Sequence, residues 1–165
     1  RLLSLFKKQP TEKPLRVSLS QYQENLTAIV TELEAQGAAV FLIAAPSNLT
    51  AEARQRLVQT GYLTLSDNAV ELHRQYLLRL RDVANQTGAV MLNVSGLFAG
   101  LDAPQDLMMR DGIHLTDRGH QVLAAILAEV CAPVLETGTA APVDDAALAR
   151  RARAAFTLPE RPEAR

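Results

Sequence analysis

Apolar residues recur along this chain in two patterns, one with helical spacing and one in short continuous runs. Helical spacing predicts a first helix over 20–36, with a Ser20-x-x-Gln23 capping box at its start and Gly37 at its end. Its inward positions share one face: Tyr22, Leu26, Ile29, Val30 and Leu33. The preceding residues 1–17 mix Leu, Lys and Pro without a clear period, which favours a connector.

Two continuous apolar runs predict strands. AAVFLIAAP at 38–46 is stopped by Pro46, and AVMLNV at 89–94 follows Gly88. Both faces of each run are apolar, a pattern typical of strands buried in a parallel sheet rather than strands with one face in water. We therefore expect both runs to be parallel strands.

Helical spacing also predicts three later helices, joined by loops. A short helix is expected over 50–59, a longer one begins at an Asn68-x-x-Glu71 cap, and the last runs over about 116–131 with Thr116 as its cap. A loop over 95–110 precedes the last helix. The positions expected to face inward on the two longer helices are Val70, Leu77, Leu80, Ala84, Val122, Leu123, Ile126 and Val130.

The order helix, strand, helix, helix, strand, helix indicates an α/β fold with a parallel sheet. Two strands are few, because open sheets usually have about four to six. Residues 1–135 are therefore interpreted as the C-terminal portion of a larger α/β domain whose other strands lie upstream or come from a partner chain. Residues 136–165 are rich in Ala, Arg and Pro, and we expect one weak helix at 144–156 followed by a frayed tail.

Composition narrows the class of protein. The 165 residues carry a formal net charge of −1, with no run of Arg and Lys of the kind that nucleic-acid binders show. No segment approaches the roughly 20 apolar residues of a membrane span. Cys131 is the single cysteine, which excludes a disulfide framework and suggests a small buried hydrophobe at a helix end. The first residue is Arg1 and no signal peptide is visible, so the sequence assigns no compartment.

Candidate chemistry concentrates in RDGIHLTDRGHQVLAAIL at 110–127, where Asp111 and His114 form one Asp-x-x-His pair and Asp117 and His120 form another. The first pair leaves the carboxyl end of a strand, where sites form in open α/β sheets. A histidine titrates near neutral pH, and an aspartate bonded to Nδ1–H fixes its tautomer and stabilises the imidazolium. The second pair falls in the first turn of a helix, where a solvated contact between residues three apart is expected.

This stretch resembles the C-terminal block of the SGNH/GDSL hydrolases, which read Asp-x-x-His, Leu-Thr and then a helix containing glycine. RVSLSQYQENLTAIV with GAAVFLIAAPS, and ELHRQYLLRLRDVANQTGAVMLNVSGLF, are similar to the family's flanking helices and strands, so the resemblance covers about residues 16–130. It implies a flavodoxin-like three-layer α/β/α fold and hydrolysis of ester bonds through an acyl-enzyme, without a cofactor or metal. It also implies His114 as general base and Asp111 as the acid that orients it. The substrate would be a small-molecule, lipid or carbohydrate ester.

The family's Gly-Asp-Ser nucleophile block, its oxyanion-hole glycine block and its Gly-x-Asn block are absent from these 165 residues. In family order all three precede the helix at 20–36, so we expect them upstream. Ser47 and Ser95 both follow strand ends, but turn residues are the simpler interpretation of each. A base and an acid without a nucleophile or oxyanion donors cannot run triad catalysis, so the chain is expected to be inactive on its own.

Two alternatives remain open at this point. Asp111, His114, Asp117 and His120 are possible ligands for Zn²⁺ or Mn²⁺, although side chains spaced by three across a loop and a helix start need not converge. The chain could also be a catalytically inactive or truncated α/β module that packs against a partner.

Overall fold

The computed structural model describes residues 15–138, 140 and 142–157. Its elements follow the order α1 (Leu19–Ala35), β1 (Phe41–Ile43), α2 (Ala51–Gln59), α3 (Ala69–Thr87), β2 (Val90–Leu92), α4 (Val94–Ala99), a 3₁₀ turn η1 (Pro104–Leu107), α5 (Asp117–Thr137) and α6 (Asp145–Thr157). Residues 1–14 of the expected connector (1–17) and the expected frayed tail over 158–165 lie outside the described residues.

The two strands pair in parallel, as the apolar runs predicted, with Phe41, Leu42 and Ile43 opposite Val90, Met91 and Leu92. Ladder bonds continue past the strand ends, from Ala44 N–H to the Leu92 carbonyl and from Ser95 N–H to the Ala44 carbonyl. The paired segments are shorter than the runs expected at 38–46 and 89–94. In the described part of the chain the sheet has only these two strands, so each has one edge without a strand neighbour.

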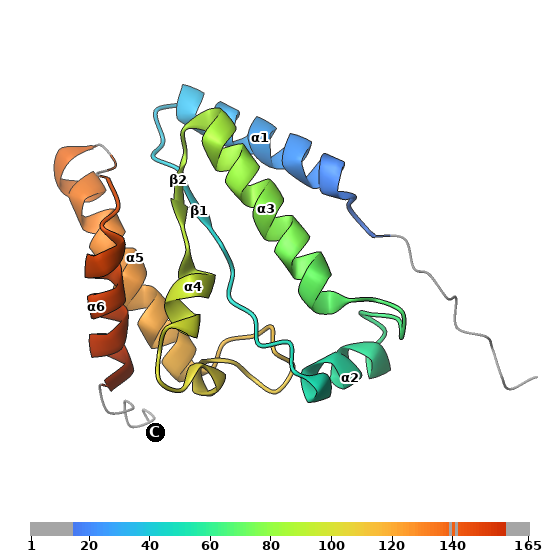
Figure 1. The fold of residues 1–165 in the computed structure, drawn as a ribbon. Helices are drawn as coiled ribbons and strands as arrows, with labels where there is room; N and C mark the ends of the chain where they lie inside the picture. Colours follow the sequence, from blue (N-terminus) through green and yellow to red (C-terminus); the bar gives the residue numbers. More distant parts are fainter. Residues whose placement is uncertain (1–14, 139, 141, 158–165) are drawn as a thin grey trace, which may run out of the picture.

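Helices cover the two faces of this sheet and give three layers (Figure 1). Side chains alternate between faces along a strand. Leu42 accordingly packs into a cluster with Val30 of α1 and Val83 of α3, whereas Leu92 packs into a second cluster with Ile126 of α5 and Leu148 of α6. This arrangement of layers agrees with part of the predicted α/β/α fold.

Local capping signals place the helix starts. Thr50, Asn68 and Thr116 accept hydrogen bonds at the N-termini of α2, α3 and α5, and the caps at Asn68 and Thr116 are those that the sequence predicted. The first helix differs, because its capping box is Ser18 with Gln21 rather than Ser20 with Gln23. The pattern S-x-x-Q occurs twice, two residues apart, and the earlier start lets Tyr22 N–H bond the Ser18 carbonyl.

Some positions predicted to face inward are exposed. Ile29 and Leu33 on α1 are 55% and 40% exposed, and Val70 at the start of α3 is 60% exposed. Val30, Leu80, Ala84, Val122, Ile126 and Val130 are buried as predicted. The apolar stripe of α1 is wider than its contact with α3, so the positions at the stripe's edge stay in water.

The predicted loop at 95–110 is wrong in its first half, because α4 begins at Val94. Asn93 caps this helix by accepting the Gly96 N–H. Val94 is the last residue of the apolar run 89–94, so the sequence pattern assigned this first residue of α4 to the strand.

The last long helix continues past its predicted end at 131. It runs through Pro133 to Thr137 and stops at Gly138, whose φ of 75° is left-handed. Cys131 is therefore inside the helix, half-buried against the core rather than at a helix end.

By length and a mean hydropathy of 1.2, α5 is also the one described helix that could cross a membrane, which the sequence pattern did not predict. Its inner face lies in the core cluster with α6.

A helix occurs where one was predicted near 144–156, and α6 packs closely on α5. Leu148, Ala152 and Ala155 are buried in the same cluster as Leu92 of β2. The Arg118 guanidinium on α5 donates to the carbonyl of Phe156 and lies 4.6 Å from the centre of its ring. These contacts make α6 a full member of the second helix layer.

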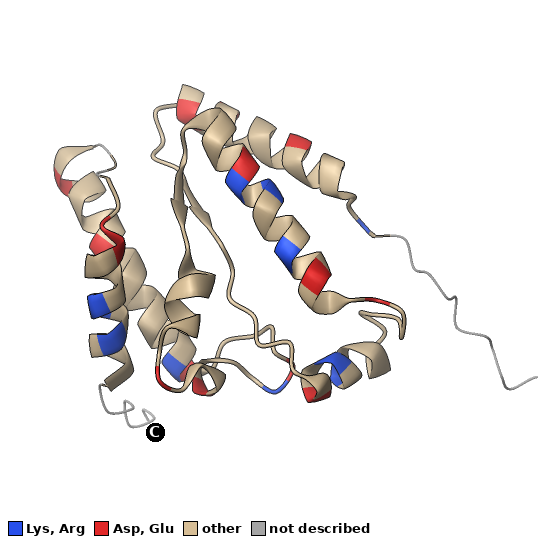
Figure 2. Cartoon of the chain, in the orientation of Figure 1, with Lys and Arg blue, Asp and Glu red and all other residues tan. Residues whose placement is uncertain are grey.

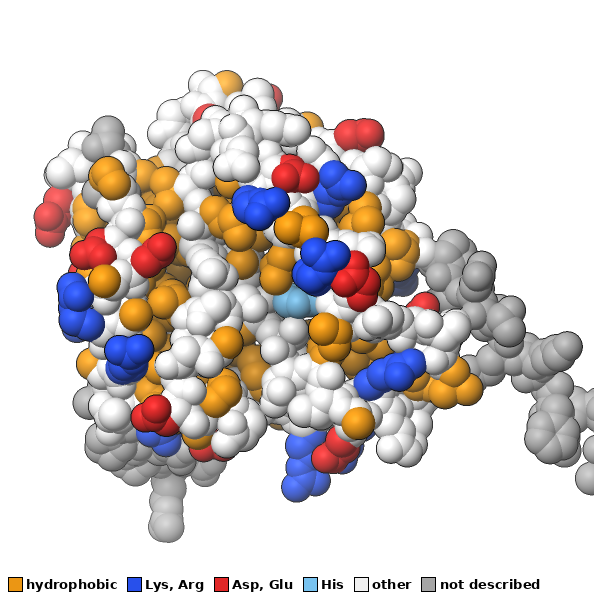
Figure 3. All heavy atoms as spheres, in the orientation of Figure 1, with side chains coloured by type: hydrophobic (Ala, Val, Ile, Leu, Met, Phe, Trp, Pro, Cys, Tyr) orange, Lys and Arg blue, Asp and Glu red, His pale blue; other side chains and the backbone are white. Residues whose placement is uncertain are grey.

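Charged residues lie on the helices and loops, with both signs interspersed, whereas β1 and β2 carry none (Figure 2). Hydrophobic side chains show at the surface between the two helix layers, over the strands (Figure 3). This distribution is consistent with a sheet that has only part of its neighbours among the described residues.

Candidate functional site

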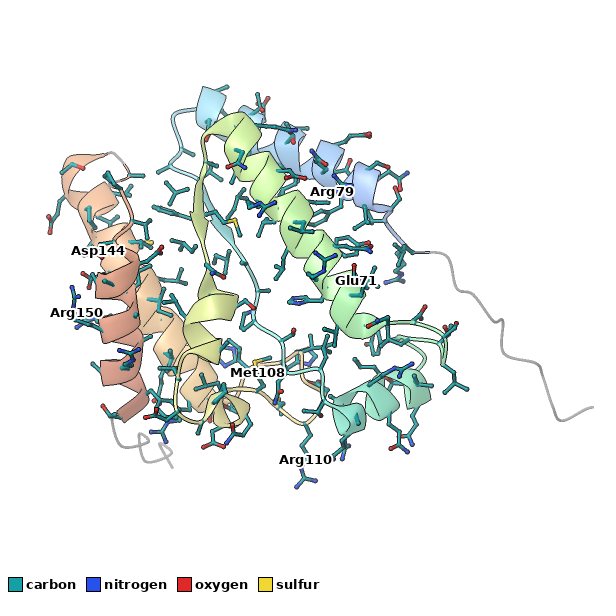
Figure 4. All side chains as sticks on the ribbon, in the orientation of Figure 1. Glu71, Arg79, Met108, Arg110, Asp144 and Arg150 are labelled. Atoms are coloured by element: carbon teal, nitrogen blue, oxygen red, sulfur yellow. The ribbon has the colours of Figure 1, made fainter. Side chains whose placement is uncertain are left out.

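The two parallel strands run in the same direction, so both carboxyl ends meet at one edge of the sheet, together with α2, α4 and the segment 100–116 (Figure 1). Met108, in that segment, lies close to α4, and Arg110 projects away from the body of the molecule (Figure 4). The Asp111–His114 pair predicted from the sequence belongs to this edge. Open α/β sheets form their sites here.

Asp111 and His114 are joined directly. His114 Nδ1 lies 2.6 Å from Asp111 Oδ2, and the second carboxylate oxygen, Oδ1, accepts the backbone N–H groups of Ile113 and His114 at 3.0 Å each. Both oxygens of the carboxylate are therefore used within four residues of chain. With Nδ1–H donated to Asp111, the ring keeps its lone pair on Nε2.

These hydrogen bonds stabilise the charged form of the carboxyl group. The bond from His114, followed by the two backbone N–H donors, lowers the pKa of Asp111 from 3.8 to about 2. Asp111 is consequently ionised throughout the range in which an imidazole titrates. A permanent negative charge beside Nδ1 is what an orienting acid has to supply.

The pair is open to solvent on one side. The His114 side chain is 73% exposed and that of Asp111 is 33% exposed. The ring can therefore contact a group presented from outside, while the carboxylate behind it is held by the loop backbone. A pair sealed inside the core could not do this.

Backbone bonds hold the loop at both ends. Met109 N–H donates to the His114 carbonyl at 2.7 Å, Met108 bridges Leu115, and Thr116 N–H donates to the Leu107 carbonyl. The Thr116 hydroxyl donates to the Asp106 carbonyl and also accepts the Gly119 N–H, which makes it the cap of α5. The predicted cap is confirmed, and it fixes the loop to the helix.

A close contact fixes the same loop to the segment that follows β1. Gly112 has φ +71°, and its carbonyl accepts the Asn48 N–H at 2.9 Å. A Cβ at residue 112 would overlap the Asn48 carbonyl oxygen and come within 3.0 Å of the Ala53 side chain. Only glycine fits both the left-handed backbone and this approach.

The second Asp-x-x-His pair is arranged differently. Asp117 and His120 are exposed in the first turn of α5, and His120 Nδ1 lies 2.9 Å from the Thr116 carbonyl oxygen rather than on a carboxylate. In the described part of the chain no three His, Cys, Asp or Glu side chains come together as metal ligands, and all four candidate ligands belong to that part. The four-ligand alternative is therefore not assembled in this fold.

A cavity of about 220 Å³ opens beside the loop, lined by Ser47 and Ser95, the two serines singled out in the sequence, and by Asn48, Phe98 and Met108 among others. Ser47 also makes a contact that the sequence did not suggest, because its Oγ lies 3.1 Å from His73 Nδ1 on α3. Burial lowers the pKa of His73, against a smaller opposite effect of the Ala45 carbonyl. The two residues are 26 positions apart, and no spacing rule connects them.

Comparison with family models assigns most of the chain to a known family. A family model described as GDSL-like Lipase/Acylhydrolase matches residues 2–127, a range that contains the elements from α1 to η1, the whole 110–116 loop and the first part of α5, but not α6. Among curated proteins, none matches this chain.

Proposed function

The chain belongs to the GDSL-like lipase/acylhydrolase family, and from this premise we propose that it supplies the His–Asp part of a serine-type ester hydrolase. In this proposal His114 is the general base and Asp111 is the residue that orients it. The observation that carries the proposal is the 2.6 Å contact between His114 Nδ1 and an Asp111 carboxylate that stays ionised. At the level of the family, the activity is hydrolysis of ester bonds.

The geometry of the pair supports both halves of the reaction. Because Asp111 holds Nδ1–H, the His114 Nε2 lone pair can take the proton of a serine hydroxyl as the serine oxygen attacks the ester carbonyl. The imidazolium, stabilised by Asp111, then gives that proton to the leaving alcohol. Water repeats the sequence on the acyl-serine: His114 takes its proton, the acid is released, and the serine is restored.

We propose that the serine, the oxyanion donors and further sheet strands come from sequence outside these 165 residues. The two-stranded sheet supports this, because each strand has an edge with no strand neighbour in the described part of the chain. Ser47 and Ser95 lie at the same edge of the sheet, but Ser47 is bonded to His73 rather than to His114. Residues 1–165 alone are thus expected to hydrolyse p-nitrophenyl acetate no faster than buffer containing free imidazole.

A second candidate, an inactive α/β module that packs on a partner, rests on the same missing nucleophile. The two candidates differ in what the intact protein contains. A Gly-Asp-Ser block followed by Gly-x-Asn ahead of Arg1 supports the hydrolase, and an intact protein without any such block supports the module. The ester itself would be a small-molecule, lipid or carbohydrate ester.

Substitution of the base tests the assignment. In the intact protein, His114→Ala is expected to lower kcat for p-nitrophenyl acetate by several orders of magnitude and to leave folding unchanged, since the ring is largely exposed. His120→Ala is the matched control, because it removes an exposed histidine six residues away that is bonded only to a backbone carbonyl. Turnover by His114→Ala at the rate of the unmodified protein would refute the role given to His114.

A further inference from the structure

The last helix, α6, packs along α5 in the antiparallel direction (Figure 1). Arg118, in the first turn of α5, contacts Phe156 near the end of α6. Further along the two helices, Arg151 Nε of α6 lies 3.7 Å from Glu129 Oε2 of α5. The end of α6 therefore lies at the start of α5, directly after the loop that carries His114. The family match ends within α5 and does not include α6.

Arg118 caps the C-terminus of α6. Its Nε donates to the Phe156 carbonyl at 3.1 Å, its Nη2 donates to the same oxygen, and its guanidinium carbon lies 4.6 Å from the centre of the Phe156 ring. The last carbonyl groups of a helix have no partner within the helix and carry the negative end of its dipole. A cation at this position therefore satisfies an orphan acceptor, and the contact with the ring adds a cation–π attraction.

The same turn of α5 holds one end of the His114 loop. Thr116, two residues before Arg118, donates its N–H to the Leu107 carbonyl and accepts the Gly119 N–H on its hydroxyl. Gly119 approaches η1 so closely that an added Cβ would overlap the Leu107 carbonyl oxygen. The turn is thus held by η1 and by the end of α6. Because the loop ends at Thr116, whatever fixes this turn also fixes that end of the loop.

The second anchor of the loop is the bond from the Asn48 N–H to the Gly112 carbonyl. The two anchors determine where the loop lies, whereas bonds inside the loop orient the His114 ring on Asp111. A shift of the first turn of α5 would therefore displace the ring while its bond with Asp111 persists.

We infer that α6 is a clamp on the first turn of α5, and that Arg118 is a positioning residue for His114. Arg118 acts on the base through the helix turn that Thr116 caps. Residues 145–157 then contribute to the geometry of the site, although the family match does not reach them. This inference rests on the proposed function, since it takes His114 as the general base.

Kinetics of the intact protein test the clamp with p-nitrophenyl acetate as substrate. Arg118→Gln removes the charge and the planar guanidinium, and it should lower kcat by roughly tenfold or more, since a displacement of about 1 Å can cost a factor of about one hundred. KM should change little, because the base acts in the chemical step rather than in binding. Arg118→Lys keeps the charge without the planar fork and should restore part of kcat.

Arg151→Gln is the matched control. It removes an arginine from the same pair of helices, but the partner of that arginine, Glu129, lies about 16 Å along α5 from Arg118 at 1.5 Å per residue. Its kcat is expected to equal that of the unmodified protein. Rates are compared at a temperature where all variants are folded, so that a loss of stability does not lower the measured kcat.

NMR separates positioning from a purely structural role of Arg118. The amide signal of His114 reports a bond inside the loop, and that of Asn48 reports the bond between the loop and the segment after β1. Both signals should shift in Arg118→Gln, move back toward their original positions in Arg118→Lys, and stay in place in Arg151→Gln. Unshifted signals in folded Arg118→Gln would overturn the inference, whatever the stability of the variant.

The two measurements also separate the clamp from the proposed function. Full turnover by His114→Ala, with shifted loop signals in Arg118→Gln, would contradict the role of His114 and not the clamp. Loss of turnover in His114→Ala, with Arg118→Gln equal to Arg151→Gln in kcat and in loop signals, would contradict the clamp alone.

Discussion

Gly112→Ala is the substitution that tests how the His114 loop is held against the end of β1. An added Cβ would overlap the Asn48 carbonyl oxygen and lie 2.9 Å from the Asn48 carbonyl carbon. The nearest atoms belong to backbone rather than to the end of a flexible side chain, so the strain cannot be relieved by a rotamer change. Either the loop or the segment after β1 has to move, and the Asn48 N–H to Gly112 carbonyl bond stretches with it.

The expected cost has two parts. An L-residue in the left-handed region costs about 1–2 kcal/mol, and Gly112 has φ +71°. Overpacking against fixed atoms adds about 1–3 kcal/mol. Gly88→Ala isolates the first part, because Gly88 has φ +84° and a Cβ there would meet nothing within 4 Å. Gly112→Ala should therefore destabilise the protein by about 1–3 kcal/mol more than Gly88→Ala.

Urea unfolding followed by circular dichroism measures both variants against the unmodified protein. In the intact protein, ester turnover of the folded variants should fall for Gly112→Ala and stay unchanged for Gly88→Ala, because only the first displaces the loop that carries His114. Equal losses of stability in the two variants would mean that the Gly112 contact with Asn48 carries no packing constraint, and the description of how the loop is anchored would be wrong.

Three further outcomes are expected. The pKa of Asp111 in the folded protein is about 2, below its ordinary 3.8. The ionised carboxylate therefore contributes stability above about pH 4, and this contribution is lost as the pH falls through 2. The unfolding free energies of Asp111→Asn and of the unmodified protein should differ at about pH 7 and converge toward about pH 2. Gly119→Ala would place a Cβ over the Leu107 carbonyl oxygen and should lower the free energy of unfolding by about 1–3 kcal/mol. An unchanged midpoint of urea unfolding would contradict the close approach of α5 to η1. Leu148→Ala should cost about 2–5 kcal/mol, because the side chain is 2% exposed; a negligible loss in thermal denaturation would show that α6 does not belong to the core.

The starts of α3 and α5 were predictable because the signals for them are local. Asn68 and Thr116 each accept a backbone N–H three residues ahead, so both the cap and its partner are visible in four letters of sequence. The left-handed glycine that ends a helix is equally local, as at Gly88. Parallel pairing was predictable from the apolar runs, but the length of the strands was not, since it depends on where the partner strand stops.

The face that a helix buries was predicted less well, because periodicity gives the direction of a stripe and not its width. Val30 is fully buried, yet Ile29 and Leu33 on the same stripe are more than one third exposed. Only packing against α3 decides which positions are covered. The start of α4 was missed for another reason: Val94 is the last residue of the apolar run 89–94, and the cap at Asn93 lies inside that run.

In the candidate site, contacts between residues close in the sequence were predictable and contacts between distant residues were not. Asp111 and His114 are three residues apart, and every hydrogen bond that orients their side chains lies between residues 111 and 114, so the sequence could predict that the two side chains meet. The contact of Gly112 with Asn48 spans 64 positions and the contact of Ser47 with His73 spans 26. Contacts between residues so far apart in the sequence arise from the packing of strand ends against helices, and no sequence motif predicts them.

Local contacts determine the orientation of the His114 ring, whereas a long-range contact determines its position. Asp111 turns the ring through bonds inside the loop, and those bonds survive if the loop moves as a unit. Gly112 determines where the loop lies relative to the end of β1, and it leaves the bonds between Asp111 and His114 intact. Asp111→Asn should therefore disturb the tautomer and charge of the pair with the loop in place, whereas Gly112→Ala should displace an intact pair. The hydrogen-bonded Nδ1 proton of His114 distinguishes the two by NMR: we expect its downfield signal to be lost in Asp111→Asn and kept, at an altered shift, in Gly112→Ala.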